Sequence, residues 1–390
     1  MRNVPKLRFK EFSGEWEEKR LEEIFEISKT KYNPLKETKE YPCIELESLS
    51  QETGKILKTF NSLEQKSIKN KFLKNEVLFG KLRPYLKKYW YSNFEGVCSS
   101  EIWVLNSKNN INKFIYYFIQ GENFISLANT TSGTKMPRAD WSLMKNEIFS
   151  IPNIQEQEKI ADFLYSVDKK ISITEEKLDL FKEYKKGIMQ KIFNQKLRFK
   201  DSNGNDYPEW KEKKLGEVFK EISERNLEEN SELLSVSLSN GVQKRSEIDI
   251  KDNSSEDKSK YKKVEKLDIV YNTMRMWQGA VGVSYYNGIV SPAYTIIRLK
   301  ENNIIEYFKY LFKTQNMIYL FKKFSQGLTS DTWNLKFDKF KEISIQLPCL
   351  EEQQKIANFL SSIDKKIDNL AAELENLKEF KKGLLQQMFV

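Results

Sequence analysis

The chain contains one long stretch twice, and this repeat constrains its fold more than any other feature. The first copy, residues 151–193, begins IPNIQEQEKIADFLYSVDKKI, and the second, residues 347–389, begins LPCLEEQQKIANFLSSIDKKI. Matching positions such as Pro152 and Pro348 are 196 residues apart. A long match at one constant separation is an internal repeat, so we expect one structural unit used twice.

Both copies are predicted to be long helices. In the second copy, apolar residues from Ile356 to Met388 recur at steps of four and three, interrupted only by Lys381. The first copy follows the same pattern, with Thr174 and Lys185 as exceptions. Such a narrow apolar stripe is typical of a coiled-coil seam. Each helix would cover about 39 residues and measure about 58 Å. The alternative is two unrelated helices, each packed on its own domain.

The repeat extends into the segments before the helices and so predicts the domain organisation. The motif KLRF occurs at residues 6–9 and again at 196–199, and each copy is followed by a Glu-Trp pair. One unit therefore comprises a globular part of about 150 residues, which is a typical domain size, and a long helix. The predicted division is a first globular domain at 1–150, a spacer helix at 151–198, a second globular domain at 199–346 and a second spacer helix at 347–390.

Within each globular part the pattern predicts an α+β fold. Short stretches rich in aromatic and β-branched residues predict strands at 41–46, 76–81, 96–105, 268–272 and 288–299. Helices are predicted at 113–127, with Asn112 as a candidate cap, and at 305–324.

The connectivity predicts how the long helices pack. If their apolar seams pack on each other, the second helix must run back along the first, giving an antiparallel pair with a domain at each end. Residues 386–389 match residues 190–193, which lead directly into the second KLRF segment. The end of the sequence is therefore expected to lie near its beginning. The predicted fold class is α+β, with two similar domains joined by antiparallel coiled-coil helices in a pseudo-two-fold repeat.

Composition excludes several classes of function. The sequence has no histidine, which removes Ser-His-Asp and Cys-His nucleophiles and every histidine-ligated metal site. Its three cysteines are far apart, which argues against a disulfide framework and fits a reducing cytoplasm. No apolar run approaches about 18 residues, so no membrane span is expected. There is no G-x-x-x-x-G-K-[ST] motif, so neither a nucleotide site nor catalysis is expected in this chain.

The charge and the unequal repeat together point to DNA. The net charge of +9 indicates an anionic partner, most simply nucleic acid. Paired DNA readers are spaced to match the duplex repeat of about 34–36 Å, which suits two domains on a spacer. Residues 28–74 differ greatly from 223–266, and divergent loops on a common frame indicate two different half-sites. The alternative is drift between the duplicated halves without a role in recognition.

Residues 81–91 are the main candidate surface of the first domain. Their sequence KLRPYLKKYWY interleaves cations with aromatic rings, a mixture that can bind phosphates and pack against base edges. Pro84 is expected to hold Arg83 extended. The alternative is that the arginine forms a structural ion pair and that the rings belong to the core. The candidate DNA-binding residues are Lys81, Arg83, Tyr85, Lys87 and Lys88.

Three further segments are candidate DNA-binding surfaces. Residues 272–278, NTMRMWQ, offer Arg275 and Gln278 for bidentate contacts to guanine or adenine. Residues 131–138, TSGTKMPR, and their counterpart 325–331, SQGLTSD, are small-residue loops that can approach a phosphate closely, or simply connect a helix to a strand. With the segment ending at residue 294, they supply the other candidates: Lys135, Arg138, Arg275, Trp277, Gln278, Tyr294 and Thr329.

Together these motifs resemble the specificity subunits of bacterial type I restriction–modification enzymes. The resemblance lies in the paired [IL]P-x-[IL]-x-EQ-x-KIA-x-FL segments, the KLRPY after a strand, GIVSPAY at 288–294 and the closing KKG-x-[LM]-Q motif, and it covers essentially the whole chain. It departs at residues 99–101, where SSE stands against SPA at 291–293, which leaves that loop of the first domain open.

The resemblance implies two target-recognition domains, each reading one half of a bipartite, asymmetric site in double-stranded DNA. The helix pair would set the spacing and dock two modification (adenine methyltransferase) subunits, and two restriction subunits would complete the complex. S-adenosylmethionine, ATP and Mg²⁺ would belong to those partners, and this chain would be non-catalytic and cytoplasmic. The rival hypotheses are a self-contained DNA methyltransferase or nuclease, and a coiled-coil adaptor that binds only protein.

Overall fold

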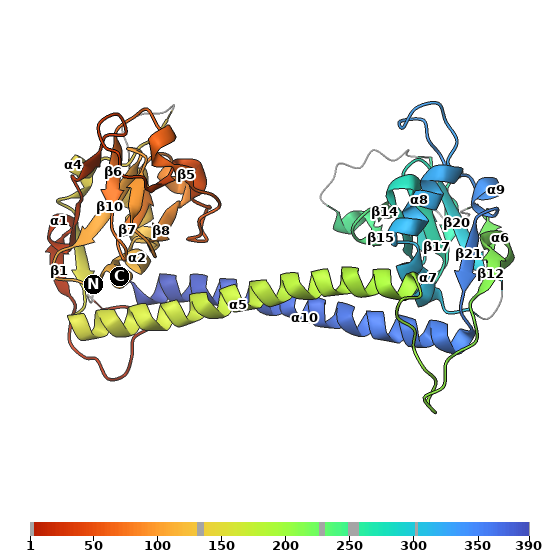
Figure 1. Ribbon diagram of the computed structural model, residues 1–390. Helices are drawn as coiled ribbons and strands as arrows, with labels where there is room; N and C mark the ends of the chain where they lie inside the picture. Colours follow the sequence, from red (N-terminus) through yellow and green to blue (C-terminus); the bar gives the residue numbers. More distant parts are fainter. Residues whose placement is uncertain (1–3, 131–135, 226–230, 249–256, 301–302, 390) are drawn as a thin grey trace. The chain divides into compact units, whose positions relative to one another are not determined.

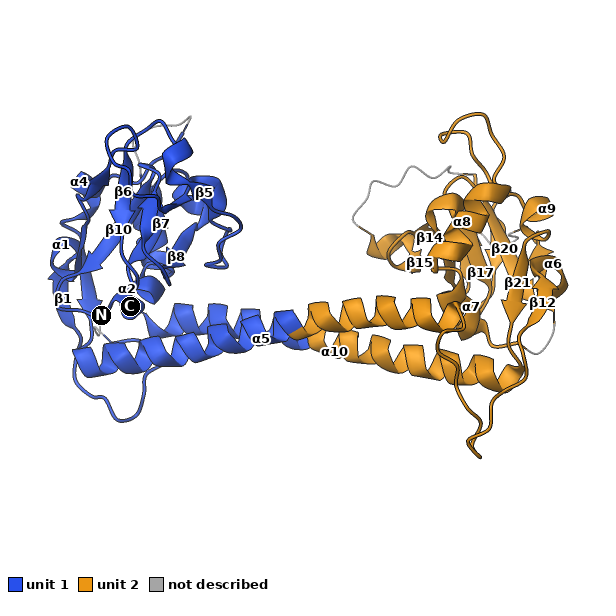
Figure 2. Ribbon diagram, viewed as in Figure 1, with its two compact units in different colours: residues 1–176, 371–390 blue, residues 177–370 orange. Residues whose placement is uncertain are grey.

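Two compact units make up the chain. The computed structural model describes residues 4–130, 136–225, 231–248, 257–300 and 303–389. Unit 1 comprises residues 1–176 and 371–390, and unit 2 comprises residues 177–370 (Figure 2). Each unit holds one globular body and one half of each of two long helices, α5 (Ile154–Phe193) and α10 (Leu350–Met388). The prediction of two long helices is confirmed.

The globular body of unit 1 is built on two sheets. An antiparallel sheet has the order β2-β10-β7-β8, a mixed five-stranded sheet has the order β3-β6-β9-β4-β5, and β1 pairs with β11. The elements are β1 (Glu17–Arg20), α1 (Leu21–Ile24), β2 (Phe25–Ile27), β3 (Lys31–Tyr32), β4 (Pro42–Ile44), η1 (Leu46–Ser48), β5 (Phe60–Asn61), η2 (Ser62–Glu64), β6 (Lys69–Phe72), β7 (Val77–Gly80), η3 (Pro84–Leu86), β8 (Tyr89–Tyr91), β9 (Gly96–Cys98), β10 (Ile102–Ser107), α2 (Asn112–Phe118), α3 (Glu122–Asn129), α4 (Trp141–Met144) and β11 (Ile148–Ile151).

Unit 2 repeats the antiparallel sheet, in the order β13-β20-β17-β18, but not the five-stranded one, which is replaced by the pairs β14-β15 and β16-β19; β12 pairs with β21. The elements are β12 (Lys211–Lys214), α6 (Leu215–Val218), β13 (Phe219–Ile222), β14 (Leu234–Ser237), β15 (Gly241–Lys244), η4 (Arg245–Glu247), β16 (Lys262–Val264), β17 (Ile269–Asn272), η5 (Met276–Gln278), β18 (Val281–Val283), β19 (Gly288–Val290), β20 (Tyr294–Leu299), α7 (Ile305–Leu311), α8 (Gln315–Phe324), α9 (Phe337–Phe340) and β21 (Ser344–Leu347).

Four predicted elements are wrong in the same way, because each is two elements rather than one. The predicted strand at 96–105 is β9 and β10, and the predicted strand at 288–299 is β19 and β20. The predicted helix at 113–127 breaks at Gly121, whose extended backbone (φ −63°, ψ 148°) starts α3. The predicted helix at 305–324 breaks at Thr314, whose side chain accepts from the Met317 amide and starts α8.

Asn112 is not a helix cap. Ile111 is the residue before α2, and Asn112 is the first residue of that helix. The Asn112 side chain instead accepts from the Ser107 amide at 2.9 Å and donates to the Asn75 carbonyl at 2.9 Å. It therefore fastens the end of β10 to the turn before β7.

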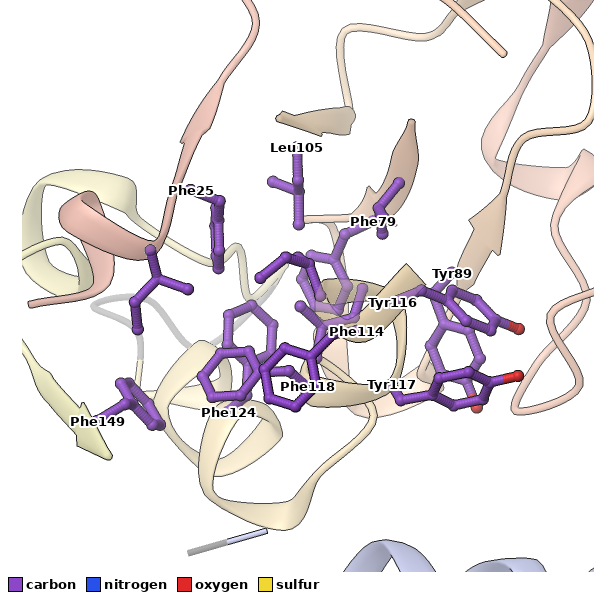
Figure 3. Close-up of a cluster of buried hydrophobic side chains, with 14 of the residues drawn as sticks. Phe25, Phe79, Tyr89, Leu105, Phe114, Tyr116, Tyr117, Phe118, Phe124 and Phe149 are labelled. Atoms are coloured by element: carbon purple, nitrogen blue, oxygen red, sulfur yellow. The ribbon is translucent and has the colours of Figure 1, made fainter. Parts of the chain in front are cut away.

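Aromatic side chains fill much of the core of unit 1 (Figure 3). The rings of Phe79 and Phe124 are 5.3 Å apart, and those of Phe118 and Phe149 are 5.1 Å apart. The same buried cluster includes residues of both long helices: Ile160, Ala161, Leu164, Val167, Ile171, Leu384 and Met388. In unit 2 the equivalent cluster takes Ile192 from α5 and Ile356, Ala357, Leu360 and Ile363 from α10. Each body therefore packs on both helices, which excludes the alternative of two separate ones.

Within unit 1 the two helices run antiparallel. Asp168 pairs with Lys381 at 2.7 Å, and farther along α5 Glu175 pairs with Lys378 at 3.0 Å. The partners on α10 therefore have lower residue numbers as the residue numbers on α5 increase, which is the order of an antiparallel pair. The matching pair in unit 2 joins Lys185 to Asp364 at 2.5 Å. Each of the two lysines that interrupt the apolar seams therefore forms an ion pair with an aspartate of the other long helix.

A tyrosine ties each body to this ion pair. The Tyr117 hydroxyl donates to Asp168 at 2.9 Å, and the Tyr310 hydroxyl donates to Asp364 at 2.8 Å. Because each aspartate accepts from the body and pairs with the other helix, one carboxylate joins three segments of each unit.

The Glu-Gln dipeptide of the repeated motif is a buried clamp. Glu156 is fully buried, and its two oxygens accept from Arg8 at 2.8 and 2.7 Å. Glu352 accepts from Arg198 at 3.2 and 2.9 Å in the same way. The neighbouring Gln157 side chain accepts from the Ile111 amide and donates to the Pro152 carbonyl. The motif therefore fixes the start of each long helix to the KLRF segment and to the body.

The end of the described chain lies beside its beginning, as the cyclic repeat predicts (Figure 1). The Leu7 amide donates to the Gln387 carbonyl at 2.9 Å, and the Phe389 ring lies 5.6 Å from that of Phe114. In unit 2 the same hydrogen bond joins Leu197 to Lys191 at 3.1 Å, but there the chain is continuous. A non-covalent contact in unit 1 thus replaces a peptide connection in unit 2.

Candidate nucleic-acid interface

Three segments of unit 1 meet at the ends of β7 and β10. The Lys81 amide donates to the Glu101 carbonyl at 2.9 Å, and the Lys81 carbonyl accepts from the Ala139 amide at 2.9 Å. The Arg83 amide donates to the Pro137 carbonyl at 2.8 Å. The candidate stretch 81–91 and residues 136–138, the described part of the second candidate stretch, therefore lie on one surface.

Arg83 is left-handed rather than extended, so the expectation drawn from Pro84 is wrong. Its φ is 53° and its ψ is 63°. The backbone hydrogen bond to Pro137 and another from the Leu86 amide to the Arg83 carbonyl, 2.9 Å, hold this conformation against the local preference. A left-handed non-glycine residue costs about 1–3 kcal/mol, and residues with such strain cluster at functional sites.

The predicted residues of unit 1 divide into exposed and packed groups. Arg83 and Tyr85 are exposed, and within the described residues no ion pair holds the Arg83 side chain. Arg138 is exposed and pairs with Glu101 at 3.0 Å. Lys88 is half-buried, donates to the Leu46 carbonyl at 2.7 Å, and has its pKa lowered by that burial. Of the other two lysines, Lys81 is half-buried and Lys87 pairs with Glu52 at 3.4 Å.

Tyr89 and Trp90, two of the four rings of the 81–91 stretch, are core residues. Tyr89 belongs to the main cluster of unit 1, and its hydroxyl donates to the Glu52 carbonyl at 2.7 Å. Trp90 lies 5.8 Å from Phe72 in a second cluster. This outcome is the alternative considered for the aromatic rings, and it leaves Tyr85 as the exposed ring of the loop.

Unit 2 brings the equivalent three segments together. The Thr273 amide donates to the Ala293 carbonyl at 3.2 Å, and the Thr273 carbonyl accepts from the Leu335 amide at 2.9 Å. These are the counterparts of the Lys81 contacts in unit 1. Arg275 is exposed on this surface, and Gln278 is half-buried beside it in η5.

Trp277 is held by a second tryptophan that the sequence analysis missed. The rings of Trp277 and Trp333 are 5.2 Å apart at 82°, and the Lys322 ammonium lies 5.2 Å from the Trp333 ring. Trp333 lies just beyond the loop 325–331 that the small-residue pattern singled out. A tryptophan so close to a candidate loop is the signal that would have found it.

The remaining predicted DNA-binding residues are Tyr294, Thr329 and Lys135. Tyr294 begins β20, and its carbonyl accepts from the Lys262 ammonium at 2.8 Å. Thr329 is exposed in the loop before α9, and its amide donates to the Thr332 hydroxyl at 3.1 Å. Lys135 lies outside the described residues. Glu101, the partner of Arg138, is the other residue that the sequence analysis did not select.

Lys313 holds two loops of unit 2 together at an energetic cost. Its ammonium donates to the Leu238 carbonyl at 3.0 Å and to the Gly279 carbonyl at 2.8 Å. Burial lowers the pKa of this lysine from 10.5 to about 8. Lys313 lies in the turn after α7, and the corresponding position after α2 in unit 1 is taken by Gln120, which donates to the Tyr116 carbonyl.

Replacing Lys313 with Gln is expected to remove a pH dependence of stability. Between about pH 8 and 10.5 the folded protein has released the Lys313 proton while the unfolded chain retains it, so stability rises with pH. The free energy of unfolding of the unaltered chain should therefore increase relative to that of K313Q over this range. Urea denaturation at several pH values measures the difference, with K266Q as an exposed control. If the unfolding free energies of the unaltered chain and K313Q changed with pH in parallel, the lowered pKa of Lys313 would be contradicted.

Neither a reactive thiol at Cys43, nor a metal-binding cluster, nor a membrane-spanning helix is found among the described residues. Burial raises the pKa of the Cys43 thiol to about 12, so it is not a thiolate at neutral pH. The residues that the structure describes contain no cluster of three or more acidic or cysteine side chains able to hold a metal ion. None of their helices is both long and apolar enough to cross a membrane.

Comparison with known proteins agrees with this architecture. A family model described as the type I restriction modification DNA specificity domain matches residues 13–182 and again 207–379. The chain is 28% identical over 319 residues to the type I restriction enzyme MjaVIII specificity subunit of Methanocaldococcus jannaschii, covering 75% of this chain and 73% of that relative.

Solved structures share the fold. The S subunit of a type I restriction–modification system from M. genitalium has a TM-score of 0.59 at 16% identity, over 99% of both chains. A chain from a structure of the assembly and conformational transition of a type I system has a TM-score of 0.55 at 17% identity, over 95% of this chain and 96% of that one.

Proposed function

The chain belongs to the family of type I restriction–modification DNA specificity proteins, and we propose that it reads a bipartite, asymmetric DNA site, one half with each unit. It is the specificity subunit, the non-catalytic and DNA-recognising component of such a system. A self-contained methyltransferase or nuclease and a protein-only adaptor are both disfavoured by this membership.

One observation supports the bipartite reading above all others. The same three segments meet in both units through two corresponding backbone hydrogen bonds, yet they present different side chains. Unit 1 presents Arg83, Tyr85 and Arg138, whereas unit 2 presents Arg275 and the paired tryptophans. A common frame with different exposed groups suits two different base sequences, because base edges are read by side chains while the frame only positions them.

The long helices offer matched surfaces for two copies of one partner. Tyr184 and Phe380 occupy the same position of the repeat, and they are 51% and 52% exposed. Two equal aromatic surfaces suit two identical modification subunits, because each copy requires the same contacts. In this proposal the helix pair also sets the spacing between the half-sites, and two restriction subunits complete a cytoplasmic complex.

Cofactors belong to the partner subunits in this proposal. S-adenosylmethionine would serve the modification subunits, and ATP with Mg²⁺ would serve the restriction subunits. Adding labelled S-adenosylmethionine to the isolated chain with target DNA tests this division. Methyl transfer without partners would contradict it.

Sequencing of methylated adenines tests the proposed function directly. In cells carrying this protein and its partners, methylation should occur at a single motif made of two unlike half-sites with a fixed gap. A palindromic motif, or methylation unrelated to this protein, would contradict the proposal. A binding isotherm that does not respond to salt would instead favour the adaptor hypothesis, since phosphate contacts give a steep salt dependence.

Replacing Arg275 with Ala is expected to weaken DNA binding by about 1–3 kcal/mol and to relax selectivity at one base of one half-site. The reason is that its guanidinium is exposed where the three segments of unit 2 meet. Competition binding of the assembled complex with DNA variants measures this effect. The matched control is K266A, an exposed cation at the other end of β17. Equal losses for the two variants would indicate only a general charge effect.

A further inference from the structure

One loop of unit 2 presents an apolar side chain entirely to solvent. The loop follows α8 and leads to α9, and it projects beyond the sheet in Figure 1. At its tip Leu328 is 101% exposed, whereas every other exposed large hydrophobic residue in the described parts of the chain is at or below 78%. Single exposed leucines are ordinary, so the case depends on how this loop is built.

The loop is closed by its own hydrogen bonds. Gln326 and Asn334 exchange two backbone hydrogen bonds of 2.8 Å each, which form the neck of the loop. Inside it, the Thr332 amide donates to the Thr329 carbonyl at 3.0 Å, and the Thr329 amide donates to the Thr332 hydroxyl at 3.1 Å. Leu328 therefore stands on an ordered turn, and not at the end of a slack connection.

Gly327, next to the leucine, cannot carry a side chain. Its φ is +144°, and a Cβ atom there would lie 2.6 Å from the Thr332 carbonyl oxygen. The close approach of the two strands of the loop requires glycine, and this approach places Leu328 at the tip.

The base of the loop joins the candidate DNA surface. The Leu335 amide donates to the Thr273 carbonyl, and Trp333 packs on Trp277, so the loop is fastened to the segment that carries Arg275. The Lys322 ammonium against the Trp333 ring adds a cation at the same place. An apolar tip on a loop whose base contacts segments that carry arginine and lysine resembles the arrangement of proteins that insert a wedge between base pairs while cations hold the phosphates.

We propose that Leu328 is such a wedge, which enters the minor groove of the half-site read by unit 2 and partly unstacks one base step. The inference rests on the proposed reading of DNA by this unit and adds a residue and a mode of recognition to it. Binding would bury the leucine between bases, and the deformability of that step would then contribute to selectivity without a hydrogen bond to a base.

The test uses the complete complex with its modification subunits and DNA carrying 2-aminopurine at successive positions of that half-site. With the unaltered protein, fluorescence should rise at one step, because unstacking relieves the quenching of this base. Leu328→Ala should abolish the rise and weaken specific binding about tenfold, since the buried side chain is lost. Leu328→Phe should retain both effects. Leu267→Ala, at the opposite end of β17, is the matched exposed control and should change neither.

The outcomes separate the wedge from the proposed function. If Leu328→Ala changes neither fluorescence nor affinity while Arg275→Ala reduces affinity, the wedge is wrong and DNA reading by unit 2 stands. If neither variant affects binding, the proposed function of this surface fails as well. If replacing thymine by uracil in the half-site weakens binding as much as Leu328→Ala does, and no step shows unstacking, then the leucine contacts a thymine methyl group in the major groove and the wedge is overturned.

Discussion

Exchange of residues 199–346 for the corresponding segment of a specificity subunit with another target is expected to change one half of the methylated DNA motif and to leave the other half unchanged. The reason is that this segment contains the whole surface on which Arg275, the paired tryptophans and the loop before α9 meet. The surface that carries Arg83 and Arg138 lies outside it. The effect is an exchange of one specificity for another, and adenine methylation sequencing measures it.

The structure shows which contacts such a chimera must keep. The Trp210 indole donates to Glu352 at 3.0 Å, and the Tyr310 hydroxyl donates to Asp364, so both side chains reach across the junction to α10. The incoming segment should therefore retain a tryptophan and a tyrosine at these two positions. The reciprocal control exchanges residues 13–150 and should change only the other half-site. A change of both half-sites in either chimera would contradict independent reading.

Replacing Arg8 with Ala is expected to destabilise unit 1 by about 3–5 kcal/mol, because it leaves a buried carboxylate without its partner. Glu156 is fully buried and accepts two hydrogen bonds from this arginine. Native-state hydrogen exchange is the suitable measurement, because it reports the two units separately. Protection should fall in the amides of unit 1 and stay the same in unit 2.

Two variants distinguish the clamp from a general effect of charge. Arg8→Lys should recover only part of the loss, because a lysine cannot make the paired contacts of a planar guanidinium. Arg20→Ala removes an exposed arginine from the end of β1 and should cost little. A loss in Arg20→Ala as large as that in Arg8→Ala would contradict the special role of the clamp.

The long helices could be predicted because their pattern is local and repeated. The apolar steps of three and four are visible along one segment, and the constant separation of the copies fixes their relation. The breaks at Gly121 and Thr314 were missed, because the apolar pattern continues across each of them and only the capping geometry of the folded chain separates the helices.

The candidate site was predictable in outline and not in geometry. The basic loops could be found by composition, and the structure places them on common surfaces. The conformation of Arg83 could not be found, because a hydrogen bond to Pro137, 54 positions later by subtraction, overrides the local effect of Pro84. In the same way, Lys185 and Lys381 looked like defects of the seams, since their aspartate partners lie on the other helix.

Unit 1 is made of two separate stretches of the chain, and this has a consequence for its synthesis on the ribosome. Unit 2 is one continuous stretch, so all of its residues have been made once translation has passed Leu370. Unit 1 needs residues 371–390, and the Leu7 amide finds its acceptor only when Gln387 has been made. Domains usually complete folding in the order of synthesis. Here the body that is translated first is completed last. The apolar surface that it buries against residues 371–390 therefore stays uncovered until nearly the entire chain has been made.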